Sequence, residues 1–431
     1  MNEEGDRMES TKKFSKEERS WIMYDWANSV FATIMMAALF PIYFTGIAGE
    51  TGDIWGGYGS SAATLVMAGL APIIGALGDR KDNKKKVFLC FWVIGIAGTV
   101  LCAVVLDWRL LLISYVVASI GYSGSCLCYD SFLTDVTTTQ RMDRVSAWGY
   151  AMGYIGGSTI PFLLAIALVL WGPQIGIDNA LAIRISVVIT VVWWALFSIP
   201  FITKVKQRYY TEESQPSIIK ETFRRVGHTA REIWQSKKLR YFIVAYFFYI
   251  DGVGTIIKMS TAYGTSLGLG STGMVLALLV TQIVAVSFAI WFSKLGKKIG
   301  GIKVILLGVS VYTVVCILGF VMGLGMEEQF LTNGQALTIF WILAVLVGTS
   351  QGGIQAMSRS YFGKMIPKEK SNEYFGFFEI FGKFASVMGP LLYSVISSLT
   401  GRSSLAILSI ILLFVIGGGI LLGGRKELEG E

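Results

Sequence analysis

Six charged side chains fall inside long apolar segments of the chain, where a carboxylate or an ammonium group could bind a polar solute or exchange a proton. They are Asp25, Asp130, Asp251, Lys258, Glu379 and Lys383. A charge at the centre of a bilayer costs about 2.5–3.5 kcal/mol on insertion scales, so these groups need partners or access to water. Charged residues at such positions therefore indicate a functional site.

Asp25 belongs to the sequence YDWANS at the start of the first apolar segment. On a helix, Asp25, Asn28 and Ser29 share one face because they are spaced at i, i+3 and i+4. Asp25 lies about one turn from the end of its segment, and Asp130 lies near the same end of the fourth. In one interpretation the two carboxylates form a gate or a proton site. In the other, Asp25 caps its helix or bonds to a neighbour such as Arg359, and Asp130 binds a loop arginine.

Asp251 lies about eleven residues into the seventh apolar segment, close to mid-depth at roughly 1.5 Å per residue. Lys258 follows two turns later on nearly the same face. This arrangement favours binding of a zwitterion or relay of a proton; the alternative is a structural ion pair between helices. Gly252 and Gly254 lower the continuity of the helix beside Asp251, and irregular backbone is tolerated in a membrane where it lines a cavity.

Two further groups of polar residues follow helical spacing near the end of the chain. Glu379 and Lys383 stand in the preferred i, i+4 order for an intrahelical ion pair. Either they satisfy each other, or a substrate or proton competes for Glu379 while Lys383 meets an anionic group. Gln351, Gln355 and Arg359 form one stripe at i, i+4 and i+8. Because such a stripe is costly against lipid, we expect it to face a cavity or the turn that follows.

The elements that carry these residues are membrane helices. The 431 residues are 53% hydrophobic and only 15% charged, whereas soluble proteins carry about 25% charge. Apolar windows of about 20 residues recur along the chain, each long enough to cross a bilayer. Because the windows show no strand-like alternation, the sequence predicts an all-α membrane protein.

Polar and Gly/Pro-rich interruptions divide the chain into twelve predicted spans. They are about 21–46, 58–78, 87–106, 110–133, 146–171, 180–202, 240–266, 272–292, 302–323, 336–358, 373–398 and 403–423. The predicted organisation is an N-terminal segment, a six-helix bundle, a central loop, a second six-helix bundle and a tail. These cover residues 1–20, 21–202, 203–239, 240–423 and 424–431. A 6+6 layout suggests two related halves around a midplane site.

The distribution of basic residues predicts the orientation. Among the 37 Lys and Arg, only Arg109, Arg184 and Arg402 fall in odd-numbered loops or the adjoining helix ends, and Lys258 and Lys383 lie within spans. All others lie at the termini or in even-numbered loops, which the positive-inside rule assigns to the cytoplasm. The net charge of +8 therefore reflects topology and contact with anionic lipid, and we expect no nucleic-acid partner.

Several classes of chemistry find no support in the sequence. No Walker loop, zinc motif or nucleophile–base set is present, which argues against a primary pump or an enzyme. Cys126 and Cys128 have no second pair or nearby His, so we expect neither a metal site nor a cofactor. His228 is the only histidine and lies in the central loop. Any proton coupling must therefore use carboxylates.

Motifs throughout the chain resemble a known family. The turn after the second span, GALGDRKDNKKKV, is similar to the helix 2–3 signature of the major facilitator superfamily. It departs at Asp82 and Asn83, and the equivalent turn of the second half has Lys297 where the Asp would be. Further matches are YDWANS, DRVSAWGYAMGYIGG, YIDGVGT, GGIQAMSRSYFGKMIP and EYFGFFEIFGKFASVMGP. Together they resemble the vacuole-effluxer family of that superfamily. The resemblance implies two pseudo-symmetric six-helix bundles with helices 1, 4, 7 and 10 around a cavity, and fungal members that export amino acids.

Two motifs fit mechanical roles in such a fold. Gly149, Gly153 and Gly157 repeat at four-residue spacing in the fifth span. This ridge permits close helix approach, which we expect at the seam between the halves. Asp79 and Arg80 would latch the cytoplasmic side through contacts with neighbouring helix ends; otherwise they form a turn that only sets topology.

The sequence favours a monomeric secondary carrier for small polar or zwitterionic solutes, amino acids first. Protons, with Na⁺ as the alternative, would couple through Asp251, Glu379 or Asp25. The alternatives are efflux or flipping of amphiphiles, lysolipids or lipids, and a membrane receptor or scaffold that transports nothing. We expect the protein in a bacterial plasma membrane, surrounded by lipid, with both termini in the cytoplasm.

Overall fold

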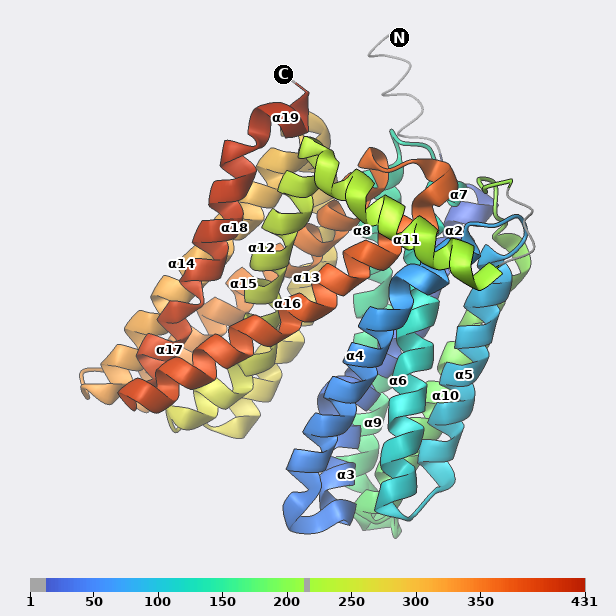
Figure 1. Ribbon diagram of the computed structural model, residues 1–431. Coiled ribbons are helices and arrows are strands. Elements are labelled where there is room, and N and C mark those ends of the chain that lie inside the picture. Colours follow the sequence, from blue (N-terminus) through green and yellow to red (C-terminus); the bar gives the residue numbers. More distant parts are fainter. Residues whose placement is uncertain (1–12, 213–217, 431) are drawn as a thin grey trace. The chain divides into compact units, whose positions relative to one another are not determined.

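The computed structural model describes residues 13–212 and 218–430, and in this part of the chain the secondary structure is helical, with no β-strand. Twelve of the helices in it are long and apolar enough to cross a membrane. Helices satisfy their backbone polar groups internally, as a lipid environment requires. The prediction of an all-α protein with twelve spans is confirmed (Figure 1).

The helices of the first half comprise the α-helices that Figure 1 labels and the shorter η stretches of π- and 3₁₀-helix. They are α2 (Lys16–Val30), η1 (Phe31–Ala38), α3 (Leu39–Ala48), η2 (Gly49–Thr51), α4 (Gly52–Gly78), α5 (Lys84–Val104), α6 (Trp108–Ser131), α7 (Leu133–Val136), α8 (Met142–Gly153), η3 (Tyr154–Thr159), α9 (Ile160–Trp171), η4 (Gly172–Ile175) and α10 (Asn179–Lys204). The remainder are α11 (Ile218–Gln235), α12 (Lys237–Ser266), α13 (Ser271–Ile299), α14 (Gly301–Glu327), α15 (Asn333–Met365), η5 (Lys368–Lys370), α16 (Ser371–Thr400), α17 (Ser403–Ser409), α18 (Ile411–Gly423) and α19 (Arg425–Glu429).

The chain groups into two compact units. Unit 1 runs to Ala230 and also takes Ile366–Ile380, so the first turns of α16 belong to it. Unit 2 comprises Arg231–Met365 and Phe381–Glu431. Within unit 1, α5 packs along α6, and within unit 2, α12 packs along α18 and α13 along α15 (Figure 1).

Two of the expected segments fall partly on residues that the structure does not describe. Residues 1–12 of the predicted N-terminal segment and residues 213–217 of the central loop lie outside the described residues. In the described part of the central loop, α11 forms a helix of its own before α12 begins.

The first helix begins at Lys16, several residues before the start that hydrophobicity predicts. Ser15 caps it: its hydroxyl accepts from the Glu18 N–H at 3.0 Å, and the Glu18 carboxylate accepts from the Ser15 N–H at 2.8 Å. This capping box satisfies two backbone donors and lets a polar sequence start a helix. Asp25 therefore lies roughly two and a half turns inside the helix, and the expected distance of one turn is wrong.

The first and fifth membrane spans each contain a stretch of wider, π-helical turn, between α2 and α3 and between α8 and α9. The stretches are η1 and η3, and they contact each other. Such turns are rare and often mark functional positions, because they displace backbone groups from regular helical bonding. The hydrophobic periodicity of the sequence did not predict either π-helical stretch.

Glycines set the closest helix contacts in unit 1. A Cβ on Gly121 of α6 would lie 2.2 Å from the backbone nitrogen of Gly95 in α5. A Cβ on Gly157 would lie 2.1 Å from the Cβ of Ser29 and 2.7 Å from the nitrogen of Val30 in α2. Contacts this short allow only glycine, as in other small-residue ridges.

The glycine ridge of the fifth span therefore packs inside unit 1. Gly153, like Gly157, lies against Ser29 of α2: its Cβ would lie 2.6 Å from the Ser29 hydroxyl. Gly149 is buried on the same helix. The contact joins α8 and η3 to α2 within unit 1. A role of the ridge at the seam between the halves stays a prediction.

Replacement of Gly157 by Ala tests this contact. The added methyl group meets backbone atoms of α2, so we expect Gly157→Ala to cost about 1–3 kcal/mol of stability. Gly69→Ala is the matched control: Gly69 lies in α4, and a Cβ there meets nothing within 4 Å. The melting temperature of each purified variant, measured in detergent, gives the comparison. Equal melting temperatures for the two variants would contradict the predicted contact.

Candidate functional site

The carboxylate of Asp251 is fully buried in α12 and lacks a partner. Among the described residues, neither of its oxygens has a hydrogen-bond partner, and the same holds for the hydroxyl of Thr255 one turn later. A Cβ on Gly389 of α16 would lie 1.9 Å from the Thr255 hydroxyl and 3.1 Å from the nearer Asp251 oxygen. Burial of an unpaired ionised carboxylate is very costly. The site therefore favours a protonated carboxyl group or a bound cation.

Lys258 does not supply the missing counter-charge. Its side chain is exposed, and in the described part of the chain no ion pair joins it to Asp251. The structural ion pair that we weighed for Asp251 therefore has no counterpart here. The Lys258 ammonium is therefore available to bind an anionic group. The Asp251 carboxyl, two turns away, is available to bind a cation.

The polar stripe on α15 turns largely into unit 2. Gln351 and Arg359 are buried, and Gln355 is half-buried. Ser358, beside the stripe, pairs with Tyr249 of α12 at 2.7 Å between the two hydroxyl oxygens. The stripe thus contacts the helix that carries Asp251.

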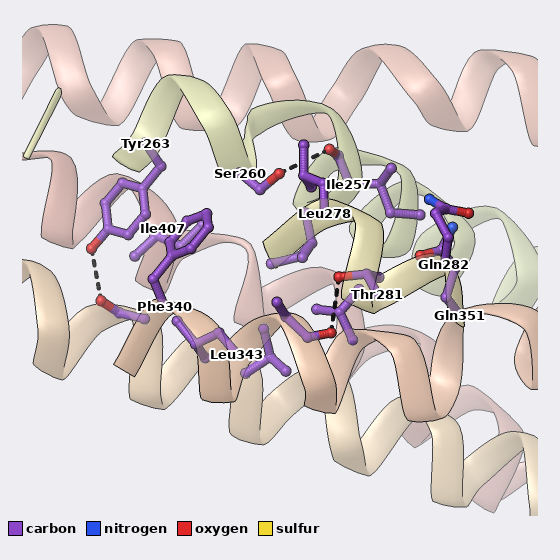
Figure 2. A pocket seen from close by; sticks show the side chains of 15 residues that line it. Ile257, Ser260, Tyr263, Leu278, Thr281, Gln282, Phe340, Leu343, Gln351 and Ile407 are labelled. Atoms are coloured by element: carbon purple, nitrogen blue, oxygen red, sulfur yellow. Dashed lines mark hydrogen bonds between the residues drawn. The ribbon is translucent and has the colours of Figure 1, made fainter. Parts of the chain in front are cut away.

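A cavity of about 70 Å³ opens within unit 2, between α12, α13, α14, α15 and α17 (Figure 2). Gln282 and Gln351 lie at one end, and Tyr263 lies at the other. The hydroxyls of Tyr263 and Thr281 donate to the carbonyls of Gly319 and Ala344, at 2.7 and 3.0 Å. Its other lining side chains are mostly apolar, among them Leu278, Phe340, Leu343 and Ile407.

Because these two hydroxyls are satisfied by backbone, the amides provide the polar end of the cavity. The side-chain oxygen of Gln282 is buried without a partner among the described residues. Gln351 was expected in a cavity. Gln282 was missed, because one amide in an apolar segment has no helical repeat to mark it.

Asp25 connects two helices of unit 1. Its carboxylate accepts a hydrogen bond of 2.7 Å from the hydroxyl of Tyr129 in α6. Trp21 stacks on that ring, with centroids 4.4 Å apart, and its indole N–H donates to the Tyr129 carbonyl at 2.8 Å. Asn28 is buried on α2, and Asp130, half-buried, follows Tyr129 on α6. The structure thus brings Asp25 beside the residue next to Asp130.

A buried carboxylate of unit 1 binds the start of α16. Asp79 is fully buried, and its two carboxylate oxygens accept from the backbone N–H groups of Asn372 and Glu373, at 2.9 and 2.8 Å. These N–H groups belong to the first turn of α16, where helices have unpaired donors and a positive dipole end. Asp79 therefore caps a helix that lies far away in the sequence.

The side chain of Asn372 fills the space beside this cap. Its amide donates to the carbonyls of Ile74 and Gly75, and it accepts from the Ser131 hydroxyl at 2.7 Å. A Cβ on Gly78 would lie 2.0 Å from the amide nitrogen. Gly75 and Gly78 of the signature thus allow the start of α16 to pack against the end of α4. Arg80, next to Asp79, pairs its backbone with Thr211 of the central loop.

A second buried contact joins the same elements. The ammonium of Lys84 lies 2.8 Å from the Asp135 carboxylate and donates to the Ser371 hydroxyl at 2.7 Å. The other oxygen of Asp135 accepts from the backbone N–H groups of Arg208 and Tyr209, at 2.7 and 2.9 Å. We call Asp79, Lys84, Asp135, Ser371, Asn372 and Glu373 the latch cluster. Asp135 was missed because it falls just after the predicted end of the fourth span.

The chain extends the latch cluster into the central loop. Arg225 of α11 lies 3.2 Å from the Glu373 carboxylate and also donates to the Thr211 hydroxyl at 3.0 Å. Farther along α16, Glu379 and Lys383 are both half-buried. The division between the units falls between them, after Ile380.

Family and sequence comparisons agree with this architecture. A family model described as "Vacuole effluxer Atg22 like" matches residues 56–138 and 134–425. The chain is 46% identical over 420 residues to the MFS-type transporter YxiO of Bacillus subtilis, with 95% of each chain covered. It is 26% identical over 350 residues to Autophagy-related protein 22 of Eremothecium gossypii, which covers 74% of this chain and 66% of that protein.

Solved structures share the fold. The human organic anion transporter MFSD10 superposes with a TM-score of 0.73 at 13% identity, covering 94% of this chain and 99% of that one. FucP in its outward conformation superposes with a TM-score of 0.70 at 12% identity, covering 94% and 98%. The predicted major facilitator fold and the predicted family resemblance are confirmed.

Loss of the Asp135 charge should destabilise the latch cluster. Asp135→Asn leaves the Lys84 ammonium buried without its counter-charge, which costs about 3–5 kcal/mol. Lys84→Met combined with Asp135→Asn removes both charges and should recover much of that loss. Thermal unfolding of purified single and double variants gives the comparison. If the double variant is no more stable than Asp135→Asn, the ion pair is not the source of the effect.

The latch cluster should also respond to pH. Burial raises the pKa of the Asp79 carboxyl from 3.8 to about 7, although Lys84 and the two N–H donors favour its ionised form. A pKa raised by folding means that protonation stabilises the fold. The contribution is present below the unfolded pKa and is lost as pH rises through the folded one.

We therefore expect the melting temperature of the wild type, relative to Asp79→Asn, to fall between about pH 4 and 7. Asparagine does not titrate, so the difference isolates Asp79. Asp178→Asn is the control, since Asp178 is an exposed helix cap and its difference should stay flat. A flat difference for Asp79→Asn would refute the pH dependence.

Proposed function

Because the chain belongs to the Atg22-like vacuole effluxer family of MFS-type transporters, we propose that it is a secondary active carrier of small polar or zwitterionic solutes, amino acids first, with proton coupling at Asp251. The observation that carries the proposal is the fully buried Asp251 carboxyl, which has no hydrogen-bond partner among the described residues. In a membrane protein such a group marks a solute or ion path by default.

Coupling follows from the cost of the buried charge. In its present surroundings Asp251 favours the neutral form, because burial removes water and, among the described residues, neither oxygen has a hydrogen-bond partner to offset that loss. A rearrangement that admits water would let the proton leave. Alternation between these two environments carries one proton per cycle, and a solute that binds only one protonation state becomes coupled to it.

A zwitterionic solute fits the charges near Asp251. The solute's ammonium group would take the place of the proton at Asp251, and its carboxylate would meet the exposed Lys258 two turns later. The polar residues Gln351 and Gln355 on α15 would supply hydrogen bonds. Glu379 and Lys383 on α16, and Asp25, Asn28 and Asp130 in unit 1, remain candidates for substrate binding or proton coupling.

The latch cluster would act as the gate of such a carrier. It ties the end of α4 and the start of α5 to the first turn of α16 through Asp79 and Lys84, and Asp135 of α7 holds Lys84. Release of α16 from Asp79 would open the protein on that side. Arg80 and Arg359, and the ridge of Gly149, Gly153 and Gly157, would guide the moving helices. By the distribution of Lys and Arg, this side faces the cytoplasm of a bacterial cell.

A second candidate function is transport of amphiphiles. The unit 2 cavity supports it, since its lining is mostly apolar with an amide end at Gln282 and Gln351 (Figure 2). A single apolar chain with a small polar head matches that lining. In this case lysolipids or drug-like amphiphiles, and not amino acids, would stabilise the purified protein.

Transport by proteoliposomes tests the proposal. We expect labelled amino acids to move in response to a pH gradient with the wild type. Asp251→Asn should lose the response to the gradient and keep solute exchange at equal pH, because asparagine cannot release a proton. Asp107→Asn is the matched control: Asp107 is an exposed cap of α6, and asparagine caps equally well.

Each part of the proposal has its own contrary outcome. Absence of flux for amino acids and for amphiphiles would leave a receptor or scaffold as the better account. Gradient-driven flux that persists in Asp251→Asn would move the coupling site elsewhere. A thermal-shift screen of amino acids, peptides and lysolipids separates the two solute classes.

A further inference from the structure

A second, basic cavity lies in unit 1 beside the latch cluster. Its volume is about 320 Å³, and it is formed by the start of α2, the turn after α7, the first residues of the central loop and the start of η5. Its charged lining residues are Lys13, Glu18, Asp135, Arg141, Arg208 and Lys368. The transport path proposed above uses none of its basic residues.

The two acidic residues of this cavity are already neutralised. Glu18 accepts from the Arg141 guanidinium at 2.7 and 2.8 Å. Asp135 is paired with Lys84 at 2.8 Å, and Lys84 does not line the cavity. The carboxylates therefore do not repel an incoming anion as free charges would.

Of the three remaining cations, only Arg208 has an ion-pair partner in the described part of the chain. Among residues 13–212 and 218–430, Lys13 and Lys368 form no ion pair; Lys368 lies over the ring of Tyr209, 5.0 Å from its centroid. Arg208 pairs with Glu17, and its side chain remains 55% exposed. The cavity also has hydroxyl groups from Ser15, Thr138 and Tyr209. Guanidinium and ammonium groups beside hydroxyls are the usual ligands of phosphate oxygens.

We propose that this cavity binds a phosphate-bearing anion through Arg208, Lys368 and Lys13. Arginine provides a planar fork for two phosphate oxygens, and the two lysines add point charges. The cavity volume exceeds that of a single small ion, so the ligand class includes pyrophosphate groups and the headgroup phosphate of an anionic lipid.

The bound anion would strengthen the latch cluster. The backbone N–H groups of Arg208 and Tyr209 bind Asp135, and η5, which begins with Lys368, leads directly into the α16 turn capped by Asp79. An anion that bridges Arg208 and Lys368 would hold both segments in these positions. Binding itself does not depend on the proposed transport function; slower transport as its consequence does.

Thermal shift with inorganic pyrophosphate tests the site. For the purified full-length protein in a detergent without phospholipid, pyrophosphate should raise the melting temperature by roughly 2 °C or more over potassium chloride of equal ionic strength. Lys368→Gln should weaken pyrophosphate affinity about tenfold or more in calorimetric titration, since it removes a charge-assisted contact. Arg208→Gln is a second variant with the same expectation.

Lys206→Gln is the matched control. Lys206 is exposed in the same segment and does not line the cavity, so its loss removes one positive charge without touching the site. It should respond to pyrophosphate as the wild type does. Monodisperse elution of each variant shows that it has folded, and Arg208→Gln decides the outcome if Lys368→Gln fails this check.

Nanodiscs distinguish the two sources of phosphate. If phosphatidylglycerol stabilises the wild type but not Lys368→Gln, and pyrophosphate then adds nothing, the ligand is a lipid headgroup. If pyrophosphate still stabilises the protein in these discs, the ligand is soluble; both results support the proposal. No stabilisation of the wild type by either probe, or an equal response of Lys368→Gln and Lys206→Gln, would overturn it.

Discussion

The first turn of α16 presents backbone N–H groups that have no acceptor within the helix, and the buried carboxylate of Asp79 accepts two of them. An uncapped helix start in a buried place would lose several hydrogen bonds, so the position of α16 depends on this contact. The surrounding residues are arranged around it. Glycines at the end of α4 admit the backbone of α16, and Asn372 fills the space that they leave. Lys84 brings a positive charge to the same region and is itself held by Asp135.

Two buried carboxylates of unit 1, Asp79 and Asp135, differ from Asp251 of unit 2 in their hydrogen bonding. In unit 1, Asp79 and Asp135 each use both oxygens, and every donor is a backbone N–H or the Lys84 ammonium. In unit 2, Asp251 uses neither oxygen within ordinary hydrogen-bond geometry among the described residues. A saturated carboxylate holds a structure in place, whereas an unsaturated one has binding capacity left. On the basis of this contrast we propose the gate in unit 1 and the coupling site in unit 2.

Composition and recurring apolar windows predicted twelve membrane helices, because a helix in lipid must be long, apolar and internally bonded, and these properties are local. The family resemblance of the motifs implied the major facilitator fold. The apolar windows failed at the start of α2, where the capping box of Ser15 and Glu18 extends the helix into polar sequence. That extension moved Asp25 deeper into the fold and beside Tyr129. The capping box is present in the sequence, but we predicted the start of this helix from hydrophobicity alone.

Only some residues of the candidate site could be predicted from the sequence. Asp251, Asp79 and Gln351 stood out because each either interrupts an apolar segment or belongs to a family motif. Asp135 and Gln282 did not, since the first lies at a span end and the second is a single amide without a repeat. Their roles arise from neighbours distant in the chain: Asp135 from Lys84 and the central loop, and Gln282 from α15. Spacing along one helix therefore identified the polar side chains whose burial costs free energy. Only the packing of several helices shows which of these side chains have partners that offset the cost.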